Sequence, residues 1–116
     1  MQASDLTGRH CQPVRKGDPP LAAPRIEELL ACLHADWQLD ADGREISRSF
    51  SFRDYYQTIA FVNALAWVAH AEDHHPDIEA GYNRCLVRYS THAISGLSDN
   101  DFICAARIDA LLTETA

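Results

Sequence analysis

The middle third of the chain constrains the fold most, because a strand pattern passes directly into the pattern of a long apolar helix. Residues 44–53 alternate between apolar side chains and serines, which predicts a half-buried strand. Asp54 and Gln57 form a pair typical of a helix start, and Pro76 ends the helix near His74. Apolar residues form two stripes along this helix. They indicate a helix packed against a sheet. Because the apolar face is so wide, part of it could also contact another subunit.

Patterns on either side of this segment complete the order of elements. The expected elements are a helix over residues 24–35, a short strand around 37–40, two strands over 77–82 and 84–91, and a last helix that begins at Ser98. Together with the middle segment they give the order α-β-β-α-β-β-α. Because this order contains no glycine-rich phosphate loop, it favours an α+β fold with helices on one face of an antiparallel sheet.

The first 20 residues differ in character from the rest. Residues 1–20 are polar and contain three of the five prolines, so we expect a flexible N-terminal arm that packs loosely. Residues 21–116 have the length and apolar content of a single domain.

Charge and composition exclude several kinds of partner. Lys and Arg total 10 against 17 Asp and Glu, so the net charge of −7 argues against binding to nucleic acid or to an anionic membrane surface. The longest apolar stretch has 11 residues, whereas a membrane span needs ~20. With no secretory signal and no CxxC pair among the four cysteines, we expect reduced thiols and a cytoplasmic protein.

The histidines are the unusual component, since four of the six lie between positions 70 and 92. His70 and His74 are four residues apart and share a helix face, while His75 stands at the helix end. An imidazole at a helix C-terminus is favoured by the helix dipole, so capping alone could account for one of them. His92 follows a predicted strand, and Asp101 is either a helix-start acid or the group that orients His92.

Three kinds of chemistry are compatible with these residues. Several histidines could act as general acid and base without a metal, because imidazole titrates near neutral pH. His70, His74, His92 and a carboxylate could instead bind zinc, although the HExxH arrangement is absent. The third alternative is a binding module whose histidines tune an interface. A nucleophilic cysteine is not favoured by the positions of the thiols.

At this point the sequence resembles the pterin-4a-carbinolamine dehydratases. The resemblance rests on His70-x-x-x-His74-His75-Pro76, five residues, Tyr82, nine residues, His92, eight residues and Asp101. The flanking segments 50–55, 90–92 and 96–98 also match, and the likeness extends over roughly residues 21–114. The motif is specific because it joins two separated histidine clusters at fixed spacing.

The resemblance implies a four-stranded antiparallel sheet with helices packed on one face, assembled as a homodimer or homotetramer. It also implies a hydro-lyase that removes water from a 4a-hydroxytetrahydropterin to give the quinonoid dihydropterin, in tetrahydrobiopterin recycling. The family's reaction uses no cofactor and no metal. An acid must protonate the leaving hydroxyl and a base must take the N5 proton, and histidines can supply both.

By the same resemblance, His74, His75 and His92 are the expected catalytic residues, with His74 and His92 as the acid–base pair. Asp101 is expected to support His92. The expected substrate-binding residues are Asp73, His75, Pro76, Ser90, Thr91 and Asp101, with His70 as a neighbour of the site.

The chain departs from the family pattern at two positions. His70 stands where many members have Glu, and Ile78 stands where animal members have Trp, so a stacking contact with the pterin is expected to be missing. The alternative function is a non-catalytic pterin-binding or protein-binding module, since animal members also act as dimerisation cofactors of a transcription factor. The full set of His74, His75 and His92 favours the enzyme.

Overall fold

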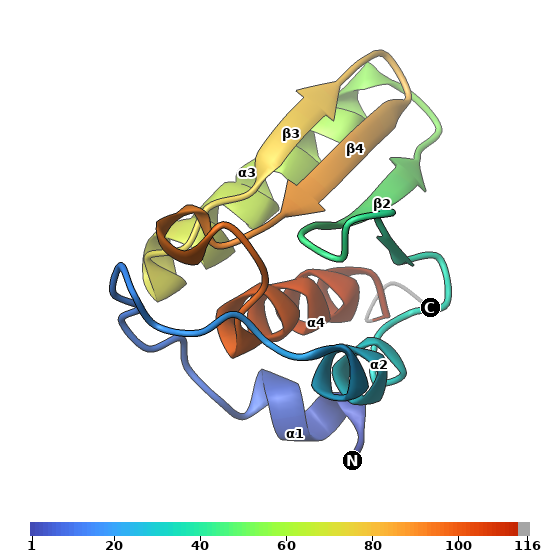
Figure 1. Cartoon of the computed structure of the whole chain (residues 1–116). Helices are drawn as coiled ribbons and strands as arrows, with labels where there is room; N and C mark the ends of the chain where they lie inside the picture. The colour runs from blue at the N-terminus through green and yellow to red at the C-terminus, as the bar shows by residue number, and fades with distance from the viewer. Residues whose placement is uncertain (114–116) are drawn as a thin grey trace.

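The protein, described here by a computed structural model for residues 1–113, is built on one sheet of four antiparallel strands in the order β1-β2-β4-β3 (Figure 1). The last three residues of the predicted domain lie outside the described range. The strands are β1 (Gln38–Leu39), β2 (Ile46–Ser51), β3 (Asp77–Ala80) and β4 (Arg84–Tyr89). The predicted α+β class and the four-stranded antiparallel sheet are confirmed.

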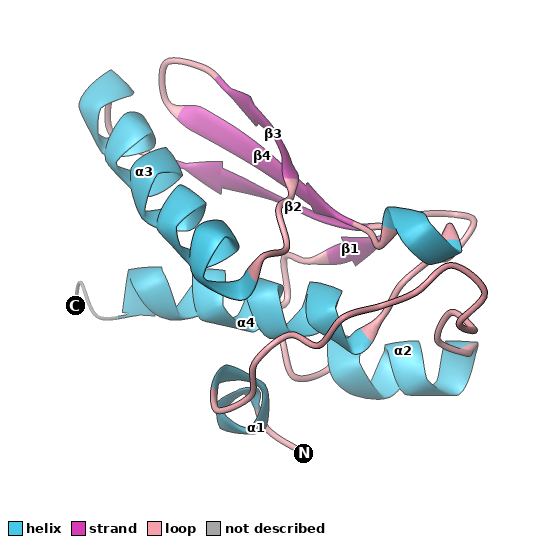
Figure 2. Cartoon of the chain, turned by 90° about the vertical axis from the view of Figure 1, so that its left-hand side faces the viewer, coloured by secondary structure: helices cyan, strands magenta, loops and turns pink. Residues whose placement is uncertain are grey.

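The helices lie together on one face of the sheet (Figure 2). They are α1 (Ala3–Thr7), α2 (Ala23–Leu30), α3 (Tyr55–Glu72) and α4 (Asp99–Thr113), with a short 3-10 helix, η1, at His92–Ile94. Helix α3 packs against β3, β4 and α4, while α1 and α2 pack on α4. Within the described residues, no helix is both long enough and apolar enough to cross a membrane.

The core forms where the inward faces of β2 and β4 meet α3 and α4. Phe50 of β2 pairs with Cys85 of β4, both are buried, and the Phe50 ring lies 4.6 Å from that of Phe61 on α3. Arg48 points to the same face of β2 as Phe50, although its side chain is charged. It is held there by Asp109 on α4, whose Oδ1 lies 2.7 Å from the guanidinium.

Several element boundaries differ from the predicted ones. The first predicted helix, 24–35, ends at Leu30, because the chain then turns with shorter-range hydrogen bonds to bring Trp37 into the core. The predicted strand 77–82 ends at Ala80, since the Gly81 N–H bonds to the carbonyl of Arg84 and closes a tight turn. The predicted strand 84–91 ends at Tyr89, and the Thr91 N–H bonds instead to the carbonyl of Gly96. The start of α3 agrees with its prediction, because the Asp54 side chain accepts a hydrogen bond from the N–H of Gln57.

The N-terminal arm is more closely packed than its polar composition suggested. Leu6 of α1 is only 1% exposed and joins the core cluster, since α1 lies along α4. Arg9 forms an ion pair of 3.0 Å with Asp99 at the start of α4. One buried apolar side chain and an ion pair therefore help to dock a mostly polar segment.

Candidate active site

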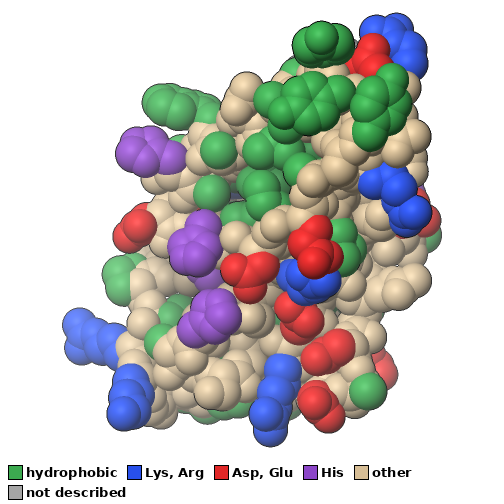
Figure 3. Space-filling model, turned by 90° about the horizontal axis from the view of Figure 1, so that it is seen from above, with side chains coloured by type: hydrophobic (Ala, Val, Ile, Leu, Met, Phe, Trp, Pro, Cys, Tyr) green, Lys and Arg blue, Asp and Glu red, His purple; other side chains and the backbone are tan. Residues whose placement is uncertain are grey.

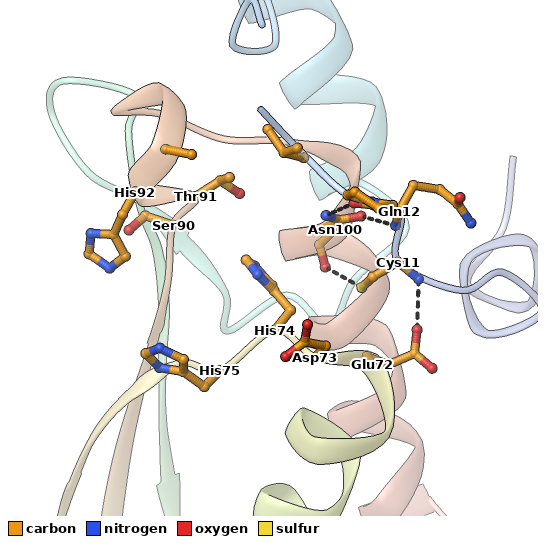
Figure 4. A pocket seen from close by; sticks show the side chains of 13 residues that line it. Cys11, Gln12, Glu72, Asp73, His74, His75, Ser90, Thr91, His92 and Asn100 are labelled. Atoms are coloured by element: carbon orange, nitrogen blue, oxygen red, sulfur yellow. Dashed lines mark hydrogen bonds between the residues drawn. The ribbon is translucent and has the colours of Figure 1, made fainter. Parts of the chain in front are cut away.

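A cavity of about 500 Å³ opens where the end of α3, the end of β4 and the N-terminal arm meet (Figure 4). Its lining residues are Cys11, Gln12, Pro13, Val14, Glu72, Asp73, His74, His75, Ser90, Thr91, His92, Ala93 and Asn100. In Figure 4, His75 and His92 lie on the same side of the site, His74 lies between them and Asn100, and the arm crosses on the opposite side. Three histidines from two separate segments therefore share one cavity.

The end of α3 places two of these histidines. Asp73 takes a left-handed conformation with φ of 52°, which short polar side chains tolerate, and it ends the helix. The N–H of His74 then bonds back to the carbonyl of Ala69 at 3.1 Å, a bond typical of a helix C-cap. This turn directs the chain away from the helix axis, so that His74 and His75 both line the cavity.

His74 is held by a buried carboxylate. Its Nε2 lies 2.6 Å from Oδ1 of Asp101, a residue that is fully buried on α4. The other oxygen, Oδ2, accepts hydrogen bonds from the Thr91 hydroxyl at 2.8 Å and from the Ser98 N–H at 3.0 Å. Because the Nε2–H donates to the carboxylate, Nδ1 of His74 is the ring nitrogen left to meet a ligand.

The surroundings of His74 favour its protonated form. Burial by itself disfavours the charge, but the hydrogen bond and negative charge of Asp101 outweigh it and raise the pKa of His74 above its usual value. The imidazole also stacks on the ring of Tyr89, with 5.3 Å between ring centres. His74 is therefore a positioned imidazole suited to donate a proton near neutral pH.

His75 and His92 are less constrained. Both are exposed, and Nδ1 of His75 lies 3.2 Å from the carbonyl oxygen of Pro76. His92 begins η1, and Ser90 and Thr91 separate it from the end of β4. Together with Ser90 and Asp73, they supply polar groups that a small heterocyclic ligand could contact.

The structure brings most of the predicted residues together, with one correction. His74, His75, His92, Asp73, Ser90 and Thr91 all line the cavity. Asp101 was expected to support His92, but its carboxylate bonds to His74, because the first turn of α4 packs behind the end of α3. Asp101 thus contributes through His74 and does not itself line the cavity.

His70 and Pro76 lie outside this cavity. They line an adjacent hollow of about 400 Å³, together with Ile78 and the apolar side chains of α3. Asp73, His74 and His75 border both spaces. In the part of the chain that the structure describes, no group of His, Cys, Asp and Glu is arranged to hold a metal ion, so the ligand set with His70 is not assembled.

The N-terminal arm, Glu72 and Asn100 contribute to the cavity, which the sequence patterns did not predict. Residues 11–14, Glu72 and Asn100 all line the cavity. Nothing in the composition of residues 1–20 pointed to a site, and Glu72 was one acid among several in its segment. Only the packing of the arm against α4 brings these residues to the histidines.

On an α+β fold with a four-stranded antiparallel sheet, three histidines line one cavity and a buried carboxylate holds one of them, an arrangement found in small acid–base enzymes. Residues 19–111 match the family described as pterin 4 alpha carbinolamine dehydratase. The chain therefore belongs to this family, and it is an enzyme of the hydro-lyase class.

Relatives agree with this placement. A Nitrosomonas eutropha protein, named for pterin-4-alpha-carbinolamine dehydratase, is 62% identical over 108 residues, which cover 93% of this chain and 94% of the relative. The crystal structure of a transcriptional coactivator/pterin dehydratase from Brucella melitensis is 32% identical with a TM-score of 0.75, covering 79% of this chain and 97% of that one. A pterin dehydratase-like protein described as a RuBisCO assembly factor in the alpha-carboxysome is 28% identical with a TM-score of 0.58, covering 67% and 90%.

Proposed function

We propose that this chain removes water from a 4a-hydroxytetrahydropterin to give the quinonoid dihydropterin, by metal-free histidine acid–base catalysis, in the recycling of tetrahydrobiopterin. The observation that carries the proposal is the buried Asp101–His74 pair beside two further histidines in one cavity. A dehydration needs one proton donor and one proton acceptor held around the same substrate, and this site offers both.

In this mechanism His74 is the acid. Asp101 stabilises its imidazolium form, and Nδ1–H gives its proton to the C4a hydroxyl, which leaves as water when the C4a–O bond breaks. His92 takes the proton from N5, and the electron pair of the N5–H bond forms the C4a–N5 double bond. The leaving hydroxyl and the proton from His74 form one water molecule, while the N5 proton ends on His92. The net protonation of the enzyme is unchanged, and transfer of one proton from His92 to solvent and from solvent to His74 restores the starting state.

The other polar residues of the cavity bind the heterocycle. His75, Ser90 and Asp73 can hydrogen-bond to the ring nitrogens and the amino and carbonyl groups of a pterin. Thr91 acts differently, since its hydroxyl bonds to Asp101 and to Ser98 within the protein. Thr91 is therefore a positioning residue for the Asp101–His74 pair.

A stopped-flow ultraviolet assay tests the proposal. A 4a-hydroxytetrahydropterin, generated in the instrument, should lose water faster in the presence of micromolar enzyme than in buffer alone. A rate equal to that of the buffer control would refute the dehydratase activity for this chain.

We also propose that the protein acts as a homodimer or homotetramer that uses the outer face of α3. Trp67 is 70% exposed and Tyr56 is 82% exposed on this helix, and Tyr82 in the adjacent turn is 66% exposed. Figure 3 shows hydrophobic side chains gathered beside the histidines on one face of the molecule. Large exposed apolar groups in such a cluster are typical of a protein contact.

The alternative of a protein-binding role is supported by the descriptions of two structural neighbours, one as a transcriptional coactivator and one as an assembly factor. The same α3 face would serve that role. Retention of full dehydratase activity in a variant that no longer self-associates would separate catalysis from the role of this surface in protein contacts.

A further inference from the structure

The N-terminal arm forms one side of the cavity, although it precedes the residues that match the family. The match covers residues 19–111, whereas residues 11–14 line the cavity next to the histidines. The arm therefore lies outside the residues that match the family model, and it lies at the site of the proposed chemistry.

Two anchors hold the arm in this position. The side-chain amide of Asn100 makes both of its bonds to the backbone of Gln12, since Oδ1 accepts from the N–H at 2.9 Å and Nδ2 donates to the carbonyl at 2.7 Å. The Glu72 carboxylate accepts from the N–H of Cys11 at 2.7 Å. Asn100 is 7% exposed and the Glu72 side chain 4% exposed, so both anchors are largely withdrawn from water.

The Glu72 anchor is stable at neutral pH. Although burial opposes its charge, the N–H of Cys11, the nearby His10 and Arg107 together lower the pKa of Glu72. The thiol of Cys11 adds a further contact, because its Sγ lies 3.5 Å from Sγ of Cys104 on α4. The arm is thus attached at several points along residues 9–12, next to the cavity-lining residues Pro13 and Val14.

These anchors determine what the arm presents to a ligand. The N–H groups of Cys11 and Gln12 and the carbonyl of Gln12 are already bonded within the protein. Pro13 has no N–H, and Val14 has an apolar side chain. At Pro13 and Val14, beyond the polar side chain of Gln12, the arm therefore offers apolar side chains, in contrast to the imidazoles, carboxylate and hydroxyl of the other segments.

We propose that Pro13 and Val14 form a wall that contacts the aliphatic substituent at C6 of the pterin and sets a preference for substituted over unsubstituted rings. This inference rests on the proposed function, because it assumes that a pterin occupies the cavity. The polar heterocycle faces the histidines, and the carbon chain lies against the apolar wall. Burial of each additional methylene there adds to the affinity.

Equilibrium binding of two oxidised, stable pterins tests the wall without requiring turnover. The probes are unsubstituted pterin and 6-propylpterin, with Kd measured from the pterin fluorescence. The wild-type protein should bind 6-propylpterin at least about fivefold more tightly. Val14→Ala should reduce this ratio to below about two, and Asn100→Ala should do the same by releasing the arm. Lys16→Ala, an exposed arm position outside the cavity lining, is the matched control and should keep the ratio.

The outcomes separate this inference from the proposed function. A ratio that is unchanged in Val14→Ala, with an unaltered thermal unfolding midpoint, overturns the wall, as does equal affinity of the wild type for both probes. If the ratio behaves as expected but the wild type shows no dehydration, the wall stands and the proposed reaction fails. If the wild type binds neither pterin but accelerates the dehydration, the wall is overturned and the proposed reaction stands.

Discussion

Asp101 and His74 lie 27 residues apart in the chain, yet the Asp101 carboxylate is 2.6 Å from the imidazole and fully buried behind it. The contact joins the first turn of α4 to the end of α3. It orients the ring, favours the protonated form and leaves Nδ1 for the substrate.

Loss of either proposed acid–base residue should reduce turnover strongly. His74→Ala and His92→Ala should each lower kcat by about 10²-fold or more, because each removes a proton-transfer group. His34→Ala, an exposed histidine outside the cavity lining, is the control and should keep wild-type activity. A larger loss in His70→Ala than in both catalytic variants would show that the roles are assigned wrongly.

Asp101→Asn should move the pH profile. Since the charge of Asp101 raises the pKa of His74, its removal should lower that pKa, and the acid should lose its proton at a lower pH. The alkaline limb of kcat/KM, measured from about pH 5 to about pH 9, should therefore shift to lower pH. Asp42→Asn, at an exposed turn position, should leave the limb in place. An unmoved limb in Asp101→Asn would mean that another group controls it.

The same pair should make stability depend on pH. The pKa of His74 is raised in the folded state, so protonated His74 stabilises the fold fully below the unfolded value of about 6.5, and the contribution is lost as pH rises through the folded pKa. Urea unfolding of the wild type and of His74→Gln should thus differ more at about pH 5.5 than at about pH 9. A difference that grows with pH would contradict the raised pKa.

Chelation should not affect the reaction. Treatment with excess EDTA followed by gel filtration should leave kcat unchanged, because Nε2 of His74 is already bonded to Asp101 and the proposed protons move between imidazoles and substrate. Loss of activity that zinc restores would favour the metal-dependent alternative.

Placing a charge on the exposed face of α3 should weaken self-association. Trp67→Glu should shift the protein to a smaller species in size-exclusion chromatography with light scattering, since a carboxylate would have to be desolvated in the contact. Glu27→Ala, at an exposed position on α2, is the matched surface control and should not change the assembly. A monomeric wild-type protein at micromolar concentration would contradict the oligomer.

Local patterns predicted most of the fold. The alternation across β2 and the Asp54 cap of α3 act within a few residues, so they could be identified without the tertiary structure. The end of α2 could not be predicted in this way. The helix ends where the chain must turn to bury Trp37 and to let its indole N–H bond to Asp109 on α4.

The sequence by itself determined the α+β class, the histidines of the site and the family, because periodicity and motif spacing are properties of neighbouring residues. Only the tertiary structure decided that Asp101 serves His74 and not His92, that His70 faces a separate hollow, and that the arm lines the cavity. Those relationships depend on which surfaces pack together. The Gln12–Asn100 contact, between residues 88 apart, exists because α4 carries Asn100 to the arm that Leu6 docks.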